Sequence, residues 1–318
     1  RMLTAVTLNA ALDKTYRVDR LAFGKSHRVT EMFAVPGGKG INVAKVAHAF
    51  GARVVASGFA GGNNGDFIER ALTGMGIAHE FVRFDGNTRE TVTVFDDAGA
   101  VMEFLEPGPF VDGQSLRELE ETLARLAARS RFVTFSGSAA RGLPADVYAR
   151  LIRVAKARGA LTLLDTSGEL LIRGLDGQPD LCKPNREELE QAAGRPLTSL
   201  GDVVRAAREL AGRGIRWVVV SLDREGSVAV SRRAAWLVEA PRIDAVNTVG
   251  CGDALVAGLV CGLDRAGSIE DEGAMAEALR LGTAAAASNA MHRFAGTVRP
   301  EEVERLLPDI RATRLDIG

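Results

Sequence analysis

The residues with the clearest chemical potential lie in a glycine-rich turn at 247–258, which leads into an apolar helix and carries one acid, Asp253. Glycines let an anion approach the backbone, and the unpaired amides of a first helical turn point at it, here those of Gly250, Cys251 and Gly252. A carboxylate in that turn can accept the proton of an attacking hydroxyl as a phosphoryl group arrives. The turn therefore predicts phosphoryl transfer, with Asp253 as the base.

A plainer interpretation of this turn stays open. Asp253 could only complement the helix dipole, and the glycines could only allow close packing. The segment is not a Walker A sequence, because no Gly-Lys-Ser/Thr follows, and it does not come after the first strand as a dinucleotide fingerprint does. A second feature is therefore needed.

A second glycine-rich turn begins a helix at residues 36–44. Gly38 allows a ligand to lie against the backbone, Asn42 offers a donor and an acceptor to sugar hydroxyls, and Lys39 supplies a compact positive charge. These residue types suit a polyol that carries a phosphate, although a solvated Lys39 at an ordinary helix start is the simpler alternative. Together, the two turns favour a site for sugar and phosphate.

Both turns need a scaffold, and the hydrophobic pattern alternates between short β-rich runs and longer amphipathic segments. This alternation is typical of βα units around a mainly parallel sheet, so we expect a doubly wound α/β fold flanked by helices. The expected strands are Leu3–Leu8, Arg53–Phe59, Phe132–Ser136, Leu161–Asp165, Leu181–Lys183 and Trp217–Ser221. The expected helices span about 40–50, 64–75, 115–128, 145–157, 185–192 and 201–213.

Two regions, about 15–35 and 90–106, break the alternation. In the second, Thr91–Phe95 and Val101–Leu105 flank the turn 96–99 as a hairpin would. We expect a small separate sheet here, which would cover the ligand cleft as a lid, pair with another subunit, or do both. No linker divides the chain, which predicts a single domain over 1–318.

Composition narrows the class of protein further. The 318 residues are 46% apolar and 25% charged with a net charge of −1, so no global charge favours nucleic acid or an anionic membrane. No apolar run approaches the roughly 20 residues that span a bilayer, and the sequence after Met2 begins like a strand rather than a signal peptide. Three cysteines without ligand or disulfide spacing favour the cytoplasm.

The two glycine-rich turns resemble the two signatures of the ribokinase family, and within it the phosphofructokinase-B branch of ketose-phosphate kinases. The resemblance covers nearly the whole chain and implies a ribokinase-like fold. Residues 7–13 resemble the branch's opening motif, which implies that Asp13 holds sugar hydroxyls. Thr88-Arg89 resembles a Thr-Arg pair whose arginine binds the substrate phosphate, so Arg89 is expected to do so beside Lys39 and Lys25.

Three further motifs extend the resemblance to the nucleotide. Residues 136–138 resemble a Ser-Gly-Ser loop near the sugar, which makes Ser138 a substrate ligand. Residues 183–188 resemble Lys-Pro-Asn-x-x-Glu and residues 219–226 a nucleotide loop, so ATP is the implied cosubstrate, with the ligands Lys183, Asn185, Ser221 and Gly226. Asn185 and Glu188 would organise Mg²⁺, through water rather than directly. Taken alone, residues 183–188 would be a strand end followed by a helix start.

The sequence departs from the family pattern at three positions. Asp223 replaces a glycine of the nucleotide loop, which leaves the conformation of that loop open. Cys251 replaces a smaller residue of the catalytic turn, and we expect the helix N-terminus to lower the pKa of its thiol. Arg141 stands in a loop that lacks the family's prolines, either as a phosphate contact or as a solvated side chain.

The resemblance implies phosphorylation of fructose 1-phosphate to fructose 1,6-bisphosphate, with tagatose 6-phosphate and fructose 6-phosphate as alternative substrates. A kinase of an unphosphorylated sugar or nucleoside would not need cations at both Lys39 and Arg89. A non-catalytic sugar-phosphate sensor would not need Asp253, Asn185 and Glu188 together. Relatives with this lid often pair through it, so a homodimer is expected.

Overall fold

The structure, a computed structural model, describes residues 2–316, and a ten-stranded sheet forms the centre of this part of the chain. The seven strands from β5 to β11 in space run parallel, and β12, β13 and β14 continue the sheet antiparallel at one edge. In spatial order the strands are β14 (Ala312–Arg314), β13 (Ala235–Val238), β12 (Ser227–Val230), β11 (Trp217–Ser221), β10 (Leu181–Cys182), β9 (Leu161–Asp165), β8 (Ser130–Ser136), β1 (Met2–Thr7), β4 (Val54–Ala60) and β5 (Ala78–Arg83).

Two layers of helices cover the sheet, each with its own apolar core. One core receives side chains from α1 (Lys39–Ala49), α2 (Gly62–Gly74), α8 (Cys251–Ala266), α9 (Glu272–Ala290) and α10 (Pro300–Leu306). The other receives side chains from α3 (Gly113–Ala127), α4 (Val147–Ala157), α5 (Gly168–Gly174), α6 (Arg186–Ala193) and α7 (Leu200–Ala211). The predicted α/β fold with helices on both faces of a mainly parallel sheet is confirmed.

Local sequence explains where these elements lie. Every residue of β1 is buried, as expected for a strand covered by helices on both faces. Both α6 and α7 begin with reciprocal capping boxes, Asn185 with Glu188 and Ser199 with Asp202, and α6 ends at Gly194 in the left-handed conformation (φ 69°). All six predicted strands and six predicted helices are present, with ends within two residues of those expected.

The chain order of the strands creates a switch point beside β1. From β1 the chain builds outward through β4 and β5 on one side, and then returns to build β8, β9, β10 and β11 on the other. Ligands of open α/β sheets bind at the carboxyl ends of the strands at such a point. We therefore expect the site near the residues that follow β1, β8 and β9.

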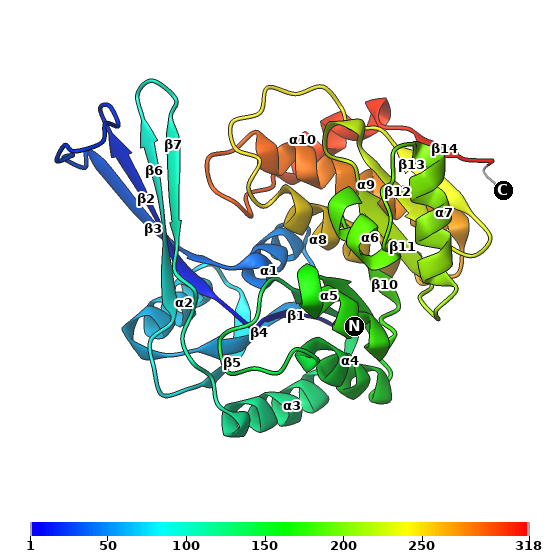
Figure 1. Ribbon diagram of the computed structural model, residues 1–318, viewed down its shortest axis with the longest axis horizontal. Coiled ribbons are helices and arrows are strands. Elements are labelled where there is room, and N and C mark those ends of the chain that lie inside the picture. Colours follow the sequence, from blue (N-terminus) through cyan, green and yellow to red (C-terminus); the bar gives the residue numbers. More distant parts are fainter. Residues whose placement is uncertain (1, 317–318) are drawn as a thin grey trace.

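A separate four-stranded sheet stands away from the main body (Figure 1). Its spatial order is β3 (Glu31–Gly37), β2 (Ala11–Val18), β6 (Arg89–Asp96) and β7 (Val101–Leu105). The hairpin turn between β6 and β7 is held by the Asp96 carboxylate, which accepts hydrogen bonds from the amides of Ala98 and Ala100. The predicted small sheet and its hairpin are confirmed.

Among residues 2–316, no helix is both long enough and apolar enough to cross a membrane. The cytoplasmic location and the single domain over 1–318 stay predictions, and residues 1 and 317–318 of that domain lie outside the described part of the chain.

Candidate active site

Asp253 lies in the first turn of α8, just after Gly250, whose left-handed conformation (φ 84°) begins the helix. Its side chain is buried, with 4% of its surface exposed. The Asp253 Oδ2 atom accepts a hydrogen bond from the side-chain amide of Asn42 in α1, at 2.9 Å. The two glycine-rich turns of the sequence therefore meet at one buried contact.

The surroundings of Asp253 suit it to accept a proton. Burial raises its pKa to about 7, and the nearby charge of Asp165 adds to this effect. The hydrogen bond from Asn42 and the charges of Lys39 and Lys183 act in the opposite direction. A base whose pKa lies near the working pH is favourable for proton transfer.

Asp165, at the end of β9, is a functional candidate that the sequence analysis did not single out. It is buried, and its Oδ1 atom lies 3.5 Å from the ammonium nitrogen of Lys183, which follows β10. Its Oδ2 atom is buried without a hydrogen-bond partner in the described structure. An acid as the last residue of a predicted strand at the carboxyl edge of a sheet was the available signal.

The first turn of α8 has amides that no earlier helical residue can accept from. The amide of Cys251 is already used, because it donates to the Thr248 carbonyl oxygen (3.2 Å). The ammonium nitrogen of Lys183 lies 3.4 Å from the position where a Cβ of Gly252 would be. The Gly252 backbone and the Lys183 ammonium group thus sit side by side at the positive end of the helix.

The expectation that the helix N-terminus lowers the pKa of the Cys251 thiol is wrong. Burial raises its pKa, and the negative charge of Asp253 adds to this, while a weak hydrogen bond from Asn289 opposes it. Desolvation of the thiolate outweighs the helix N-terminus at this position. Asn289, in α9, also donates to the Val249 carbonyl oxygen (2.9 Å) and accepts from the Gly296 amide (2.8 Å), so it holds the catalytic turn against a neighbouring loop.

Asn42 and Lys39 project from the first turn of α1, which begins after Gly38 at a φ of 106°. The buried Oδ1 atom of Asn42 has no partner in the described structure and can accept from a ligand hydroxyl. Lys39 is exposed, and its pKa is raised chiefly by Asp165. The charge of Lys39 therefore interacts with Asp165 and Asp253, whereas the sequence analysis expected it to share a phosphate with Arg89.

Asp13, in β2, lies directly against the second turn. A Cβ atom at Gly37 would lie 1.9 Å from the Asp13 Oδ2 atom, so only glycine fits beside this carboxylate. Its Oδ1 atom accepts a hydrogen bond from the Thr91 hydroxyl in β6. Burial raises the pKa of Asp13, and the hydrogen bond from Thr91 and the charges of Lys45 and Arg89 lower it.

Arg89 begins β6 and is held by backbone rather than by acids. Its guanidinium donates to the carbonyl oxygen of Asn9 at 3.1 and 3.3 Å and to that of Glu106 at 3.1 Å. These bonds use three of the five N–H groups that a guanidinium has. The remaining donors and the full positive charge stay available for an anion, as the phosphate role requires.

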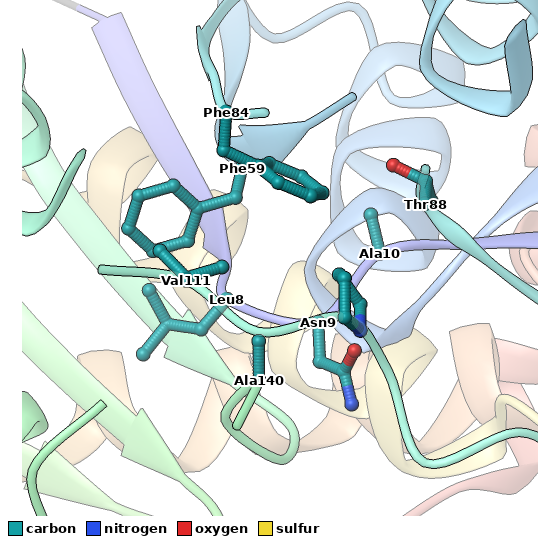
Figure 2. A pocket seen from close by; sticks show the side chains of 9 residues that line it. Leu8, Asn9, Ala10, Phe59, Phe84, Thr88, Val111 and Ala140 are labelled. Atoms are coloured by element: carbon teal, nitrogen blue, oxygen red, sulfur yellow. The ribbon is translucent and has the colours of Figure 1, made fainter. Parts of the chain in front are cut away.

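Asn9 connects Arg89 to the Ser-Gly-Ser loop, because its side-chain amide donates to the Ser138 hydroxyl (3.0 Å). Behind Asn9 lies a small pocket, with the rings of Phe59 and Phe84 on one side and Asn9 and Thr88 on the other (Figure 2). It has room for about one water molecule, which excludes a sugar. The pocket therefore supports the site from behind and does not bind the substrate.

Asn185 and Glu188 bind each other's backbone at the start of α6. The Asn185 Oδ1 atom accepts from the Glu188 amide (2.8 Å), and the Glu188 Oε1 atom accepts from the Asn185 amide (3.0 Å). The plainer interpretation of this segment, a strand end and a helix start, is thus correct for the backbone. Burial nevertheless raises the pKa of Glu188, and the negative charge of Asp165 adds to this effect. The Glu188 carboxylate therefore interacts with Asp165.

The candidate nucleotide loop follows β11. Ser221 ends that strand and pairs with Asn185 through an isolated backbone bridge. Asp223 adopts a left-handed conformation (φ 51°), which explains how it takes the place of a glycine. Gly226 cannot be replaced in the same way, because a Cβ atom there would lie 2.0 Å from the Val238 carbonyl oxygen.

Of two further cations of the sequence analysis, Lys25 lies apart from this cluster, whereas Arg141 is bonded to Gly108, which packs against Asn9. Lys25 is exposed on the loop between β2 and β3, at the end of the small sheet that points away from α1 (Figure 1). Arg141 is exposed, and its Nε atom donates to the Gly108 carbonyl oxygen (2.9 Å). The structure therefore does not bring Lys25 to the site within this chain.

Comparison with known proteins agrees with this arrangement. A tagatose-6-phosphate kinase of Staphylococcus epidermidis is 33% identical over 312 residues, which cover 97% of this chain and 98% of that protein. The crystal structure of Escherichia coli phosphofructokinase-2 in complex with fructose-6-phosphate is similar, with a TM-score of 0.88, 27% identity and coverage of 97% and 98% of the two chains. Arabidopsis thaliana ribokinase shares the fold, with a TM-score of 0.74, 20% identity and coverage of 96% and 98%.

The profile of the pfkB family of carbohydrate kinases matches residues 6–301. This match spans both glycine-rich turns, the Asp165–Lys183 pair and the nucleotide loop. The chain therefore belongs to the pfkB family of carbohydrate kinases.

Proposed function

We propose that this carbohydrate kinase transfers the γ-phosphoryl group of ATP to a primary hydroxyl of a ketohexose phosphate. The observation that supports the proposal most strongly is the hydrogen bond between Asn42 and Asp253, because it joins the proposed base to the turn suited to a sugar. The positive charge of Arg89, held by backbone carbonyls, supports a substrate that already carries a phosphate.

Each residue of the cluster has a distinct role in the proposed reaction. Asp253 accepts the proton of the attacking hydroxyl, while the Gly252 amide, Lys183 and Lys39 offset the charge of the transferring phosphoryl group. Binding energy from the far end of the substrate orients the hydroxyl for attack. At that end Arg89 binds the phosphate.

The sugar ring would lie between these two ends. Asp13 and the Oδ1 atom of Asn42 accept hydrogen bonds from its hydroxyls, and Gly38 lets it approach the backbone. Ser138 lies within the same reach through its bond to Asn9. The roles of Asp13, Asn42 and Ser138 are those that the sequence analysis predicted.

ATP would lie over the carboxyl ends of β10 and β11. The loops that follow these neighbouring strands carry Lys183, Asn185, Ser221 and Gly226. Lys183 contacts both Asp165 and the start of α8, which links the nucleotide side to the catalytic turn.

Mg²⁺ would enter with the nucleotide. Among residues 2–316 no cluster of three or more His, Cys, Asp or Glu side chains could hold a metal alone, which fits an ion carried mainly by phosphates and water. The unpartnered Asp165 Oδ2 atom and the Glu188 carboxylate are the groups that would receive its water molecules. When bound, Mg²⁺ would neutralise charge on the β- and γ-phosphates.

The small sheet would act as a lid over the sugar and as a dimer surface. Its two edge strands expose large apolar side chains, among them Met32 in β3 and Phe104 and Leu105 in β7, each more than half exposed. Such edges favour pairing with a second copy. Phe104→Asp is expected to shift the protein towards monomer in sedimentation velocity, and an unchanged oligomeric state would count against this surface.

Fructose 1-phosphate is the first candidate substrate, because the sequence resemblance favours it. Tagatose 6-phosphate is the second, because a relative named tagatose-6-phosphate kinase is 33% identical. A pocket that holds a phosphate at one end of a ketohexofuranose ring and a hydroxyl at the other suits either sugar, so ring stereochemistry decides between them.

ADP release over a panel tests the proposal. The panel contains fructose 1-phosphate, fructose 6-phosphate, tagatose 6-phosphate, the same sugars without phosphate, and adenosine. We expect turnover with at least one sugar phosphate, and an increase of its KM by about tenfold or more in Arg89→Met. Arg150→Met, which breaks a half-buried pair with Glu120 on α4 and α3, is the matched control. Turnover only with unphosphorylated substrates would contradict the proposal.

A further inference from the structure

Lys45 is a charged residue of α1 that the proposed reaction does not use. Its ammonium group donates a hydrogen bond to the carbonyl oxygen of Pro36, at the end of β3. It has no carboxylate partner within 4.0 Å among residues 2–316. A desolvated ammonium group without a direct ion pair destabilises the folded state, so other contacts must stabilise Lys45 at this position.

The alkyl part of Lys45 is covered by the loop that follows α9. A Cβ atom at Gly296 would lie 2.9 Å from the Lys45 Cδ atom, and Gly296 has a positive φ of 79°. The backbone of this loop therefore rests on the Lys45 side chain, as only glycine allows. The same loop is bonded to Asn289, which holds the turn before α8.

The charged groups that face Lys45 are the proposed sugar ligand and the proposed base. Asp13, in β2, and Asp253, in α8, both stabilise its positive charge, yet burial lowers its pKa to about 8. The interaction is mutual, because the positive charge of Lys45 lowers the pKa of Asp13. This effect of Lys45 is larger than the effect of the Arg89 charge in β6. Of these two cations, Lys45 therefore favours the ionised form of the half-buried Asp13 more strongly, in addition to the hydrogen bond from Thr91.

We propose that Lys45 is a positioning residue for the sugar, which fixes the turn at Pro36–Gly38 and holds Asp13 as a carboxylate. The inference rests on the proposed function, because it concerns the same sugar phosphate. Two geometric facts carry it. The ammonium group is bonded to the carbonyl just before Gly37, and the Asp13 carboxylate lies against Gly37.

Loss of Lys45 should affect the affinity for the sugar phosphate more than the rate of phosphoryl transfer. An ionised carboxylate accepts hydrogen bonds from sugar hydroxyls more strongly than a protonated one does. Loss of Lys45 frees the Pro36 carbonyl and so loosens the turn against which Asp13 lies, and it also raises the pKa of Asp13. Sugar binding should therefore weaken, most strongly at low pH. Asp253 keeps Asn42, Lys39 and Lys183 as neighbours, so proton transfer is much less affected.

The wild-type enzyme gives a first test that needs no variant. Deprotonation of Lys45 near pH 8 removes the charge that strengthens its hydrogen bond to the Pro36 carbonyl, so KM for the sugar phosphate should rise as the pH passes from about 7 to about 9, while KM for ATP stays level. The substrate phosphate is fully ionised in this range, since its second pKa is near 6. A sugar KM that stays level over the same range would overturn the inference.

Substitution gives the second test. In Lys45→Met, KM for the sugar phosphate should rise by about tenfold or more, with kcat and KM for ATP within about threefold of wild type. This KM should also rise at low pH sooner than in wild type, and Lys45→Arg should restore part of the affinity. Lys156→Met is the matched control, because Lys156 also donates to a carbonyl oxygen, at the exposed surface of α4.

Outcomes separate the inference from the proposed function. If wild type turns over no sugar phosphate, the proposed function fails. If wild type is active but Lys45→Met lowers only kcat, or lowers only thermal stability with KM unchanged, Lys45 is not a positioning residue for the sugar.

Discussion

The side chain of Asn42 donates a hydrogen bond to the carboxylate of Asp253 (2.9 Å) across 211 positions of sequence. This bond joins the first turns of α1 and α8, which were separate glycine-rich motifs in the sequence. Both partners are buried, so the bond is shielded from solvent and stronger than it would be at the surface. The base of the proposed reaction is thus oriented by the helix that also offers an acceptor to the sugar.

The raised pKa of Asp253 predicts how kcat changes with pH. Because that pKa is about 7 and the base must be unprotonated, kcat should fall as the pH drops through about 7. Removal of the Asn42 hydrogen bond raises the pKa, so Asn42→Ala should move this fall in kcat to higher pH. Steady-state kinetics over about pH 5.5–8.5 measure it, with Gln114→Ala, on the exposed face of α3, as the control. A fall at unchanged pH in Asn42→Ala would disprove this coupling.

Replacement of Asp165 should shift the pH dependence of kcat in the opposite direction to replacement of Asn42. Its negative charge helps to raise the pKa of Asp253, so Asp165→Asn should move the fall in kcat to lower pH. The variant also removes the charge partner of Lys183 and one proposed ligand of magnesium-bound water. We therefore expect a higher Mg²⁺ concentration at half-maximal rate. Unchanged values of both quantities would exclude Asp165 from the site.

The sequence predicted most of the fold because its signals were local. Central strands such as Trp217–Ser221 are continuous apolar runs, and helix starts such as Ser199 carry capping residues. Of the strands that were missed, β12, β13 and β14 have three or four residues each and lie at an antiparallel edge, where the pattern is too short to identify. The fourth, β5, is a parallel edge strand with only one buried residue, so its apolar pattern is weak. Bounds within two residues were enough to place the switch point.

The sequence predicted most residues of the candidate site, but it did not predict the contacts between them. Asp253, Asn42 and Asp13 were found because they lie in motifs. Asp165 owes its importance to burial and Lys45 to its contact with the Pro36 carbonyl, and no motif reports either property. The Cys251 prediction was wrong for the same reason, since desolvation of its thiolate depends on the fold. The influence of Asp165 on the pKa of Lys39 likewise depends on the fold, since the two residues are 126 positions apart in the sequence.

Gly252 offers a test of the anion-binding turn without loss of fold. An added methyl group would lie 3.4 Å from the Lys183 ammonium nitrogen and would crowd the phosphoryl group, while alanine is a better helix former than glycine. Gly252→Ala should therefore keep or raise the melting temperature and lower kcat by about tenfold or more. Gly74→Ala in α2, where no atom lies within 4 Å of the added methyl, is the control. Normal kcat in Gly252→Ala would argue against this turn as the phosphoryl site.

The central claim is that Asp253 is the base of a sugar-phosphate kinase, and Asp253→Asn tests it most directly. Asparagine keeps the size of the side chain but cannot accept the proton. The account predicts that the variant binds the sugar phosphate and ATP with affinities within about threefold of wild type, measured by calorimetry, and loses about 10²–10⁴-fold in kcat. Turnover close to wild type with the same sugar phosphate would contradict it.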